Sequence, residues 1–305
     1  MNCPDYDITG ITGAIMNTVY QRVDLSTLPY SRYSYCMPEY LTHESAWLEH
    51  APFTFWLVSE HQPSRIVELG TYAGYSYFTF CQAATYLPHN TECFAVDTWQ
   101  GDEQAGYYPA TIYERVHTYN EKNYQNFSTL IRSDFDSALQ YFKDSSIDLL
   151  HIDGSHTYTS VRNDFINWLP KMSSRGIILF HDTQVRRQGF GVYRLWEELR
   201  GHYPHFEFTH GFGLGVLAVG SNISESLLTL LNAESDSDYS GCARYIYASL
   251  GKRISEKVYD ALDDNELRTL PEKLGIKYAD LAESIQELSP KAAAVLLRLA
   301  EFEAS

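Results

Sequence analysis

Apolar segments with the length of β-strands alternate with segments of helical periodicity, and this alternation constrains the fold most. The strand-like segments include RIVEL from Arg65, ECFAVD from Glu92 and GIILFHD from Gly176, and helix-like segments such as TYTSVRNDFINWLPKM lie between them. Apolar strands separated by helices are typical of a parallel sheet with helices on both faces. The late segment FEFTHGFGLGVLAV reads as two further strands, so an antiparallel edge is expected at the end of this α/β sheet.

The segments before and after this alternation are expected to be mainly helical. HESAWLEHAPFTFWLVSEH carries apolar residues at helical spacing, and we assign residues 1–62 to an N-terminal helical or lid segment. The central domain then covers residues 63–222. A polar stretch, NAESDSDYSG, leads into residues 235–305, which are expected to form a C-terminal helical extension that packs on the core or joins subunits.

The composition excludes some partners and favours others. A net charge of −16 at pH 7 repels phosphate backbones, so no nucleic-acid partner is expected. The five cysteines show no CxxC spacing, which argues against a zinc knuckle or a disulfide framework. No apolar run reaches the roughly 18 residues of a membrane span and no signal-peptide pattern is seen, so a soluble, cytoplasmic protein is expected. The 24 tyrosines offer aromatic contact surface, which favours a homo-oligomer.

The first strand leads into a glycine-containing turn, Glu68-x-Gly70-x-x-x-Gly74, and then into a helix. Gly70 permits backbone angles that side chains forbid, and Gly74 lets a ligand approach the start of the helix. The spacing differs from the GxGxxG dinucleotide fingerprint, and no GK[ST] phosphate loop is present. The turn alone is therefore consistent either with architecture or with the floor of a nucleoside pocket.

Acidic residues at the next strand ends favour a pocket. Asp97 ends the second strand, where a carboxylate can accept hydrogen bonds from both ribose hydroxyls of a nucleoside. Ser133 and Asp134 follow the third strand and could meet an adenine edge. Glu68 would face a positively charged amino-acid group, whereas it would receive a pyrophosphate poorly. The small-molecule ligand that fits this set is S-adenosylmethionine (SAM).

Four segments, VELGTYAGYS, FAVDTWQGD, LLHIDGSHTY and ILFHDT, occur in an order that resembles the class I SAM-dependent methyltransferases. The sequence is most similar to a bacterial branch associated with O-methylation of carbohydrates and natural products, sometimes joined to glycosyltransferase domains. The resemblance implies a Rossmann-like, seven-stranded, mostly parallel sheet with an antiparallel last strand, and it makes residues 63–222 the methyltransferase domain. The residues expected to bind SAM are Glu68, Gly70, Thr71, Gly74, Ser76, Asp97, Trp99, Ser133 and Asp134.

Two further strand ends carry residues suited to catalysis. Asp153 follows the fourth strand and His181 and Asp182 end the fifth, so these side chains converge if the two strands are neighbours. Two carboxylates and an imidazole suit Mg²⁺ or Mn²⁺, and the imidazole favours a transition metal. The arrangement resembles metal-dependent small-molecule O-methyltransferases, in which an acid is more usual where His181 stands. His156 is then the expected general base, and Asp153 and His181 are counted with it as catalytic.

Other roles for these residues stay open. Asp153 could form a turn or cap a helix, and His181 could be a buried histidine bonded to the backbone. A metal-free mechanism could use either His156 or His181 as the base.

The acceptor is expected to lie between two loops. A tyrosine-rich insertion follows the second strand, and a basic loop follows the fifth. The residues concerned are Asp102, Glu103, Tyr107 and Tyr108 in the first loop and Arg186, Arg187 and Arg194 in the second. The expected function is O-methylation of a sugar, glycoside or related natural product; a phenolic or antibiotic-type acceptor and a non-catalytic SAM-binding scaffold are the alternatives.

Overall fold

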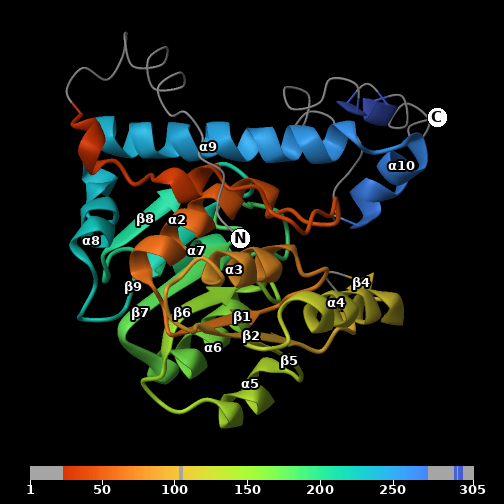
Figure 1. The fold of residues 1–305 in the computed structure, drawn as a ribbon, viewed down its shortest axis with the longest axis horizontal. Helices are drawn as coiled ribbons and strands as arrows, with labels where there is room; N and C mark the ends of the chain where they lie inside the picture. The colour runs from red at the N-terminus through yellow and green to blue at the C-terminus, as the bar shows by residue number, and fades with distance from the viewer. Residues whose placement is uncertain (1–22, 103–105, 274–291, 294, 298–305) are drawn as a thin grey trace.

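A seven-stranded sheet forms the centre of the protein (Figure 1). The computed structural model describes residues 23–102, 106–273, 292–293 and 295–297. The strand order is β5-β2-β1-β6-β7-β9-β8; the first five strands are parallel, and β9 pairs antiparallel with both β7 and β8. The expected Rossmann-like fold with an antiparallel last strand is thus confirmed. The strands are β1 (Arg65–Leu69), β2 (Glu92–Asp97), β5 (Ser128–Arg132), β6 (Ile147–Ile152), β7 (Met172–His181), β8 (His205–Phe208) and β9 (Leu214–Ala218).

Helices cover both faces of the sheet because successive strand residues point to opposite sides. In β1, Ile66 joins the apolar layer of α2, α3, α4, α8 and α9, whereas Val67 and Leu69 join the layer of α5, α6 and α7. The helices are α2 (Ala51–His61), α3 (Tyr75–Ala84), α4 (Ala110–Asn123), α5 (Phe135–Ala138), α6 (Tyr158–Trp168), α7 (Val192–Leu199), α8 (Glu225–Leu231), α9 (Ser237–Asp260) and α10 (Asp264–Lys273), with short 3-10 helices η1 (Leu25–Thr27), η2 (Arg32–Tyr35), η3 (Leu48–His50), η4 (Leu139–Tyr141), η5 (Leu169–Lys171) and η6 (Ala233–Ser235).

The long helix α9 lies along α2 and the N-terminal segments (Figure 1). The ring of Tyr247 lies 5.3 Å from that of Phe53 on α2 and 5.3 Å from that of Phe208 on β8, and its hydroxyl donates to the Pro29 carbonyl. Helix α9 therefore shares the core of the sheet. The boundaries at residues 62, 222 and 235 stay a prediction, and residues 1–22, 274–291, 294 and 298–305 of the two end segments lie outside the described residues.

The insertion after β2, predicted as a long connection, contains regular structure. A small hairpin of β3 (Gly101–Asp102) and β4 (Gly106–Tyr107) precedes α4. Helix α4 buries only Ile112, Val116 and Asn120 among its fourteen residues, which explains why its sequence shows little apolar periodicity. Strand β7 also begins earlier than predicted, at Met172.

The length of the helices and the state of the cysteines bear on the expectations drawn from the composition. None of the helices within the described residues is long and apolar enough to cross a membrane. Cys81, Cys93 and Cys242 are buried free thiols, whereas Cys36 is disulfide-bonded, which the cysteine spacing did not indicate.

Candidate active site

A cavity of about 430 Å³ opens at the carboxyl ends of the parallel strands, beside the point where the strand order reverses at β1. Its volume is within the range of small-molecule pockets, about 300–1,000 Å³. Most of the predicted site residues line it, namely Gly70, Thr71, Gly74, Ser76, Asp97, Asp134, Asp153, His156, His181 and Asp182.

The turn between β1 and α3 can approach β6 because residue 70 is a glycine. A Cβ atom at Gly70, where φ is +87°, would lie 2.2 Å from the Asp153 carbonyl oxygen. The Gly70 amide donates to the Val96 carbonyl at 3.0 Å, and the Asp153 amide donates to the Leu69 carbonyl at 2.8 Å. The ends of β2, β1 and β6 are thereby fixed side by side at the floor of the cavity.

Asp97 lines the cavity and organises the neighbouring turn. Its Oδ2 accepts from the amides of Thr71 at 2.8 Å and Tyr72 at 2.9 Å, and its Oδ1 accepts from the Trp99 amide at 2.7 Å. Burial raises the pKa of Asp97, although these backbone donors oppose the shift. Trp99 lies outside the cavity lining, and its indole N–H donates to the Tyr72 carbonyl at 3.0 Å, so it supports the turn from behind.

Glu68 does not face the cavity, which corrects the prediction that it meets a charged part of the ligand. It shares the side of β1 with Ile66, so its carboxylate lies in the layer between the sheet and α3. There Oε2 lies 2.8 Å from His151 Nδ1, and both side chains are fully buried. Burial raises the pKa of Glu68, with His151 opposing the shift. Ser133 is also outside the cavity lining, and its hydroxyl donates to the Asp134 carbonyl.

The carboxylate that does line this side of the cavity belongs to Glu44, which the sequence analysis missed. The segment 44–47 before α2 contributes Glu44, Ser45, Ala46 and Trp47 to the lining. Arg115 on α4 donates to Glu44. Only the packing of α2 onto the sheet brings this segment to the strand ends, so no local motif marks it.

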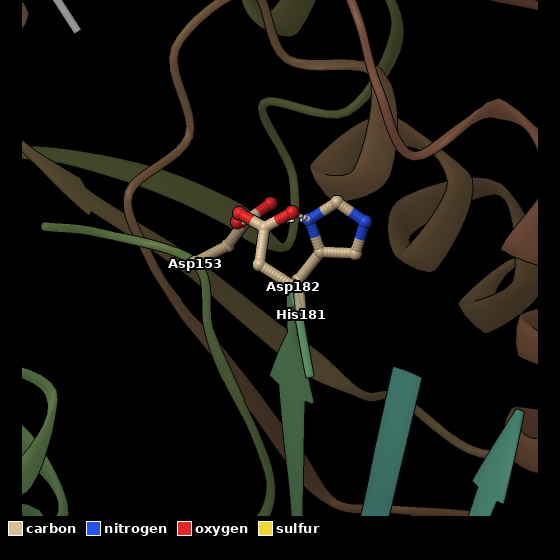
Figure 2. A group of neighbouring side chains, drawn as sticks. All are labelled: Asp153, His181 and Asp182. Carbon is tan, nitrogen blue, oxygen red and sulfur yellow. Dashed lines mark hydrogen bonds and ion pairs between the residues drawn. The ribbon is translucent and has the colours of Figure 1, made fainter. Parts of the chain in front are cut away.

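Asp153, His181 and Asp182 converge at the ends of β6 and β7 as predicted (Figure 2). One potential ligand atom from each residue lies within 4.8 Å of the other two. His181 Nδ1 is 3.2 Å from Asp153 Oδ1 and 3.5 Å from Asp182 Oδ1. The backbone of Asp182 has φ +63°, a left-handed conformation that turns the chain at the cavity.

The second ring nitrogen of His181 fixes the tautomer. Nε2–H donates to the Gly211 carbonyl at 3.1 Å, so in the neutral ring the Nδ1 lone pair points to the two carboxylates. Metal-binding histidines commonly donate their other ring N–H in this way. Without a cation, burial lowers the pKa of His181, but Asp182 and Asp153 outweigh it and raise the pKa to about 9. The donor set fits a divalent cation that accepts nitrogen as well as oxygen ligands.

His156 stands beside this group at the cavity wall. Its Nε2 lies 2.9 Å from Asp182 Oδ2, and its ring stacks on Phe190 with centroids 4.7 Å apart. Burial would lower the pKa of His156, but the hydrogen bond and charge of Asp182 raise it. Asp182 thus orients His156 as well as belonging to the candidate metal group.

The two acceptor loops are only partly as predicted. Tyr108 lines the cavity and packs on Tyr72 with ring centroids 4.5 Å apart, whereas Tyr107 is 81% exposed. Glu103 and the side chain of Asp102 lie outside the described residues. In the basic loop Arg187 lines the cavity, together with the apolar residues Val185 and Phe190. Phe212, from the turn between β8 and β9, also lines it.

The other two basic residues contact α7 instead of the cavity. Arg186 lies 3.8 Å from Glu197, and both Arg186 and Arg194 lie over the ring of Tyr193. Neither lines the cavity.

Two further features of the cavity lining bear on ligand binding. The hydroxyl of Thr71 is buried at the cavity and has no hydrogen-bond partner among the described residues. The ring of Phe135, next to Asp134 in the sequence, also lines the cavity. It packs closely on Gly154, where a Cβ atom would lie 2.4 Å from the ring. Donors, acceptors and an aromatic ring are thus available along the floor.

The strand order, the antiparallel last strand and a cavity at the strand ends are the features that the sequence resemblance led us to expect. Residues 67–183 match the family model described as a methyltransferase domain. The uncharacterized protein y4gI from Sinorhizobium fredii (strain NBRC 101917 / NGR234) is 51% identical over 201 residues, which make up 66% of this chain and 22% of that protein. The chain therefore spans about a fifth of the length of this curated relative.

Solved structures of methyltransferases are similar at the level of the fold. The O-methyltransferase TomG from Streptomyces achromogenes, in complex with SAM, is 16% identical with a TM-score of 0.44, covering 60% of this chain and 92% of that chain. The SAH-bound Podospora anserina methyltransferase PaMTH1 is 14% identical with a TM-score of 0.44, covering 55% and 77%. Likenesses of this size say nothing about the acceptor.

Proposed function

We propose that this chain transfers a methyl group from SAM to a hydroxyl of a small molecule, with sugars, glycosides and related natural products as the first acceptors to test. The observation that carries the proposal is the meeting of two residue sets in one cavity. One set suits a nucleoside, and the other offers two carboxylates and two imidazoles next to it. A pocket that only bound SAM would gain nothing from burying such groups, because desolvated charges are costly.

The cofactor-binding residues follow from the lining. Asp97 would accept hydrogen bonds from the ribose hydroxyls, since its oxygens keep acceptor capacity beside the three backbone donors. Asp134 and Phe135 would meet the adenine, while Thr71 and Ser76 offer hydroxyls to the amino-acid part. Glu68 would act from behind the floor and not by contact.

Methyl transfer is an in-line displacement in which the bond from methyl carbon to sulfur breaks as the bond from methyl carbon to acceptor oxygen forms. The sulfonium becomes a neutral thioether, and the acceptor hydroxyl must lose its proton. Because Nε2 of His156 pairs with Asp182, Nδ1 is the atom left to take that proton. Phe190 holds the imidazole plane by stacking on it.

Asp153, His181 and Asp182 would hold a divalent cation, Mg²⁺ or Mn²⁺, and the nitrogen ligand favours Mn²⁺. When bound, such a cation supplies positive charge that lowers the pKa of an acceptor hydroxyl. Without it, Asp182 and His156 alone still form an oriented base. Metal-dependent and metal-free transfer are therefore distinguished by experiment.

The lining favours two kinds of acceptor on separate observations. Tyr72, Tyr108 and Glu44 offer aromatic faces and a carboxylate, which suit a sugar. Phe190 and Phe212 beside His156 offer a flat apolar wall, which suits a phenolic or antibiotic-type molecule. A homo-oligomer is proposed from the tyrosine content and the helical C-terminal segment, and light scattering on the purified protein tests it. A cytoplasmic location is proposed from the scattered cysteines without CxxC spacing, and cell fractionation tests it.

Calorimetric titration with S-adenosylhomocysteine tests the cofactor site, and absence of binding would reject the proposal. Incubation with methyl-labelled SAM and panels of sugar, glycoside and phenolic acceptors should then reveal label in a product stable to base, as expected of an ether. Activity lost with EDTA and restored by Mn²⁺ or Mg²⁺ would support the metal, whereas turnover insensitive to EDTA would remove it. SAM binding with no acceptor methylated in any panel would favour the scaffold alternative.

A further inference from the structure

We infer that His50 is a positioning residue for the candidate metal ligand His181, acting through the carbonyl of Gly211. This inference rests on the proposed function, because it concerns how the same site is prepared for a cation. His50 ends η3 directly before α2 and is fully buried. It does not line the cavity.

Two imidazoles donate to one carbonyl oxygen. His50 Nε2 lies 2.9 Å and His181 Nε2 lies 3.1 Å from the oxygen of Gly211, and the two ring centroids are 5.5 Å apart. Since a carbonyl only accepts, both rings must carry their proton on Nε2. His50 therefore holds the acceptor that fixes the tautomer of His181, and this tautomer directs Nδ1 to Asp153 and Asp182.

The carbonyl needs such a support because its loop is strained. Gly211, Phe212 and Gly213 have φ values of +56°, +68° and +92°. This left-handed conformation is unfavourable for Phe212, which has a Cβ atom, whereas the two glycines adopt it readily. Besides His50, the Gln184 amide holds this loop by donating to the Phe212 carbonyl at 2.9 Å. A Cβ at Gly211 would lie 2.9 Å from His50 Nε2, so the loop and the imidazole are in close contact.

The same contact joins two parts of the cavity that are far apart in the sequence. His50 follows the segment 44–47, and Phe212 lies in the turn between β8 and β9; both the segment and Phe212 line the cavity. Without the His50 donor, the Gly211 carbonyl should no longer be held in position. His181 should then lose the acceptor that fixes its tautomer, and Phe212 should move from its position in the cavity lining. Among the described residues, the side chain of Asp97 is hydrogen-bonded to the turn after β1 and not to the loop 211–213. Loss of the His50 donor should therefore have little effect on this part of the cavity.

The test compares His50→Phe, which keeps a ring but no donor, with His50→Gln, whose amide nitrogen can still donate to Gly211. Mn²⁺ binding is measured by electron paramagnetic resonance, and S-adenosylhomocysteine binding by calorimetry. We expect His50→Phe to weaken Mn²⁺ binding about 10- to 100-fold, as losses of supporting partners of metal ligands do. We expect His50→Gln to stay within about threefold of the unmodified protein, and both variants to bind S-adenosylhomocysteine normally.

Equal Mn²⁺ affinity in His50→Phe and the unmodified protein would overturn the inference, as would equal losses in the Phe and Gln variants. If His50→Phe does not fold, His50→Met removes the donor with less bulk and serves the same comparison. An unmodified protein that binds S-adenosylhomocysteine but not Mn²⁺ would reject this inference and leave metal-free methyl transfer standing. Failure to bind S-adenosylhomocysteine would instead reject the proposed function.

Discussion

His156 and His181 both line the cavity, but their ring nitrogens have different hydrogen-bond partners. The carboxylate of Asp182 accepts from His156 and leaves Nδ1 as its free basic atom. The carbonyl of Gly211 accepts from His181 and directs Nδ1 of that ring to Asp153 and Asp182. These partners are the reason why the proposed mechanism uses His156 for proton removal and His181 for cation binding.

Replacement of His156 by alanine should reduce kcat by about 10²- to 10⁴-fold, because a positioned general base contributes a factor of this size. S-adenosylhomocysteine affinity should be nearly unchanged, since the proposed mechanism has His156 act on the acceptor and not on the cofactor. His117 is a matched control, because it is exposed on α4 and stacks only on Tyr113. Steady-state kinetics in which His156→Ala is as active as His117→Ala would show that the base lies elsewhere.

Gly70→Ala should destabilise the protein by about 3 kcal/mol or more, because the new Cβ meets the Asp153 carbonyl and the residue keeps a positive φ. Gly106→Ala is the control: φ is +80° there too, but no atom of the described residues lies within 4 Å of the new Cβ. It should cost only about 1 kcal/mol. Urea unfolding measures both; similar losses would mean that backbone conformation, and not the close approach of β1 to β6, requires Gly70.

At the scale of single elements, helix α6 carries a buried carboxylate that makes stability depend on pH. Burial, with the nearby Asp136 adding to it, raises the pKa of Asp164 from its ordinary 3.8 to about 7. Between these values the unfolded chain is ionised at this residue while the folded one stays protonated. The folded state binds the extra proton, so the free energy of unfolding falls as the pH rises from about 4 to 7 and then levels off.

Asp164→Asn should remove this fall. Between pH 5 and pH 8 the unmodified protein should lose about 1–3 kcal/mol more stability than the variant, as judged from a shift of this size. Urea unfolding at the two pH values measures the difference. Asp144→Asn, at a side chain that is 72% exposed, is the control and should keep the pH dependence of the unmodified protein. An unchanged dependence in Asp164→Asn would contradict the assignment.

The elements could be predicted from the sequence where one periodicity dominates. Strands β1 and β2 were predicted at their observed bounds, because both are short apolar runs ended by turns. Helix α4 was not, since it buries three side chains and shows a mostly polar face. The strand-end rule also placed Asp97, Asp153 and Asp182 correctly at one cavity.

The rest of the site could not be predicted because it depends on contacts between distant segments. Glu68 lies one residue before the end of β1, and alternation turns its side chain beneath the floor. Glu44 and Phe212 reach the cavity only after α2 and the β8–β9 turn have packed on the sheet. His50 is marked by no motif, and its role follows solely from the position of the Gly211 carbonyl.

At the scale of the whole molecule, α9 decides whether the central domain can stand alone. The sequence suggests a domain that ends at residue 222, followed by an extension. In the structure α9 buries apolar side chains in the layer that covers one face of the sheet, among them Tyr239, Ala243, Tyr247, Leu250, Ile254, Val258 and Tyr259. A buried large apolar side chain contributes about 1.5–3 kcal/mol, so their sum is comparable to the net stability of about 5–15 kcal/mol that is typical of a domain.

A chain truncated after residue 222 should therefore fail to unfold cooperatively, because the apolar layer around Phe53 on α2 and Phe208 on β8 would be exposed to water. Circular dichroism during heating, compared with the full chain, measures this. Tyr247→Ala provides a milder version, expected to cost about 3–5 kcal/mol while the chain still folds. A truncated chain with a sharp transition and normal S-adenosylhomocysteine binding would contradict the shared core. It would mean that α9 is an added arm, and that the central domain ends where the sequence alone placed its boundary.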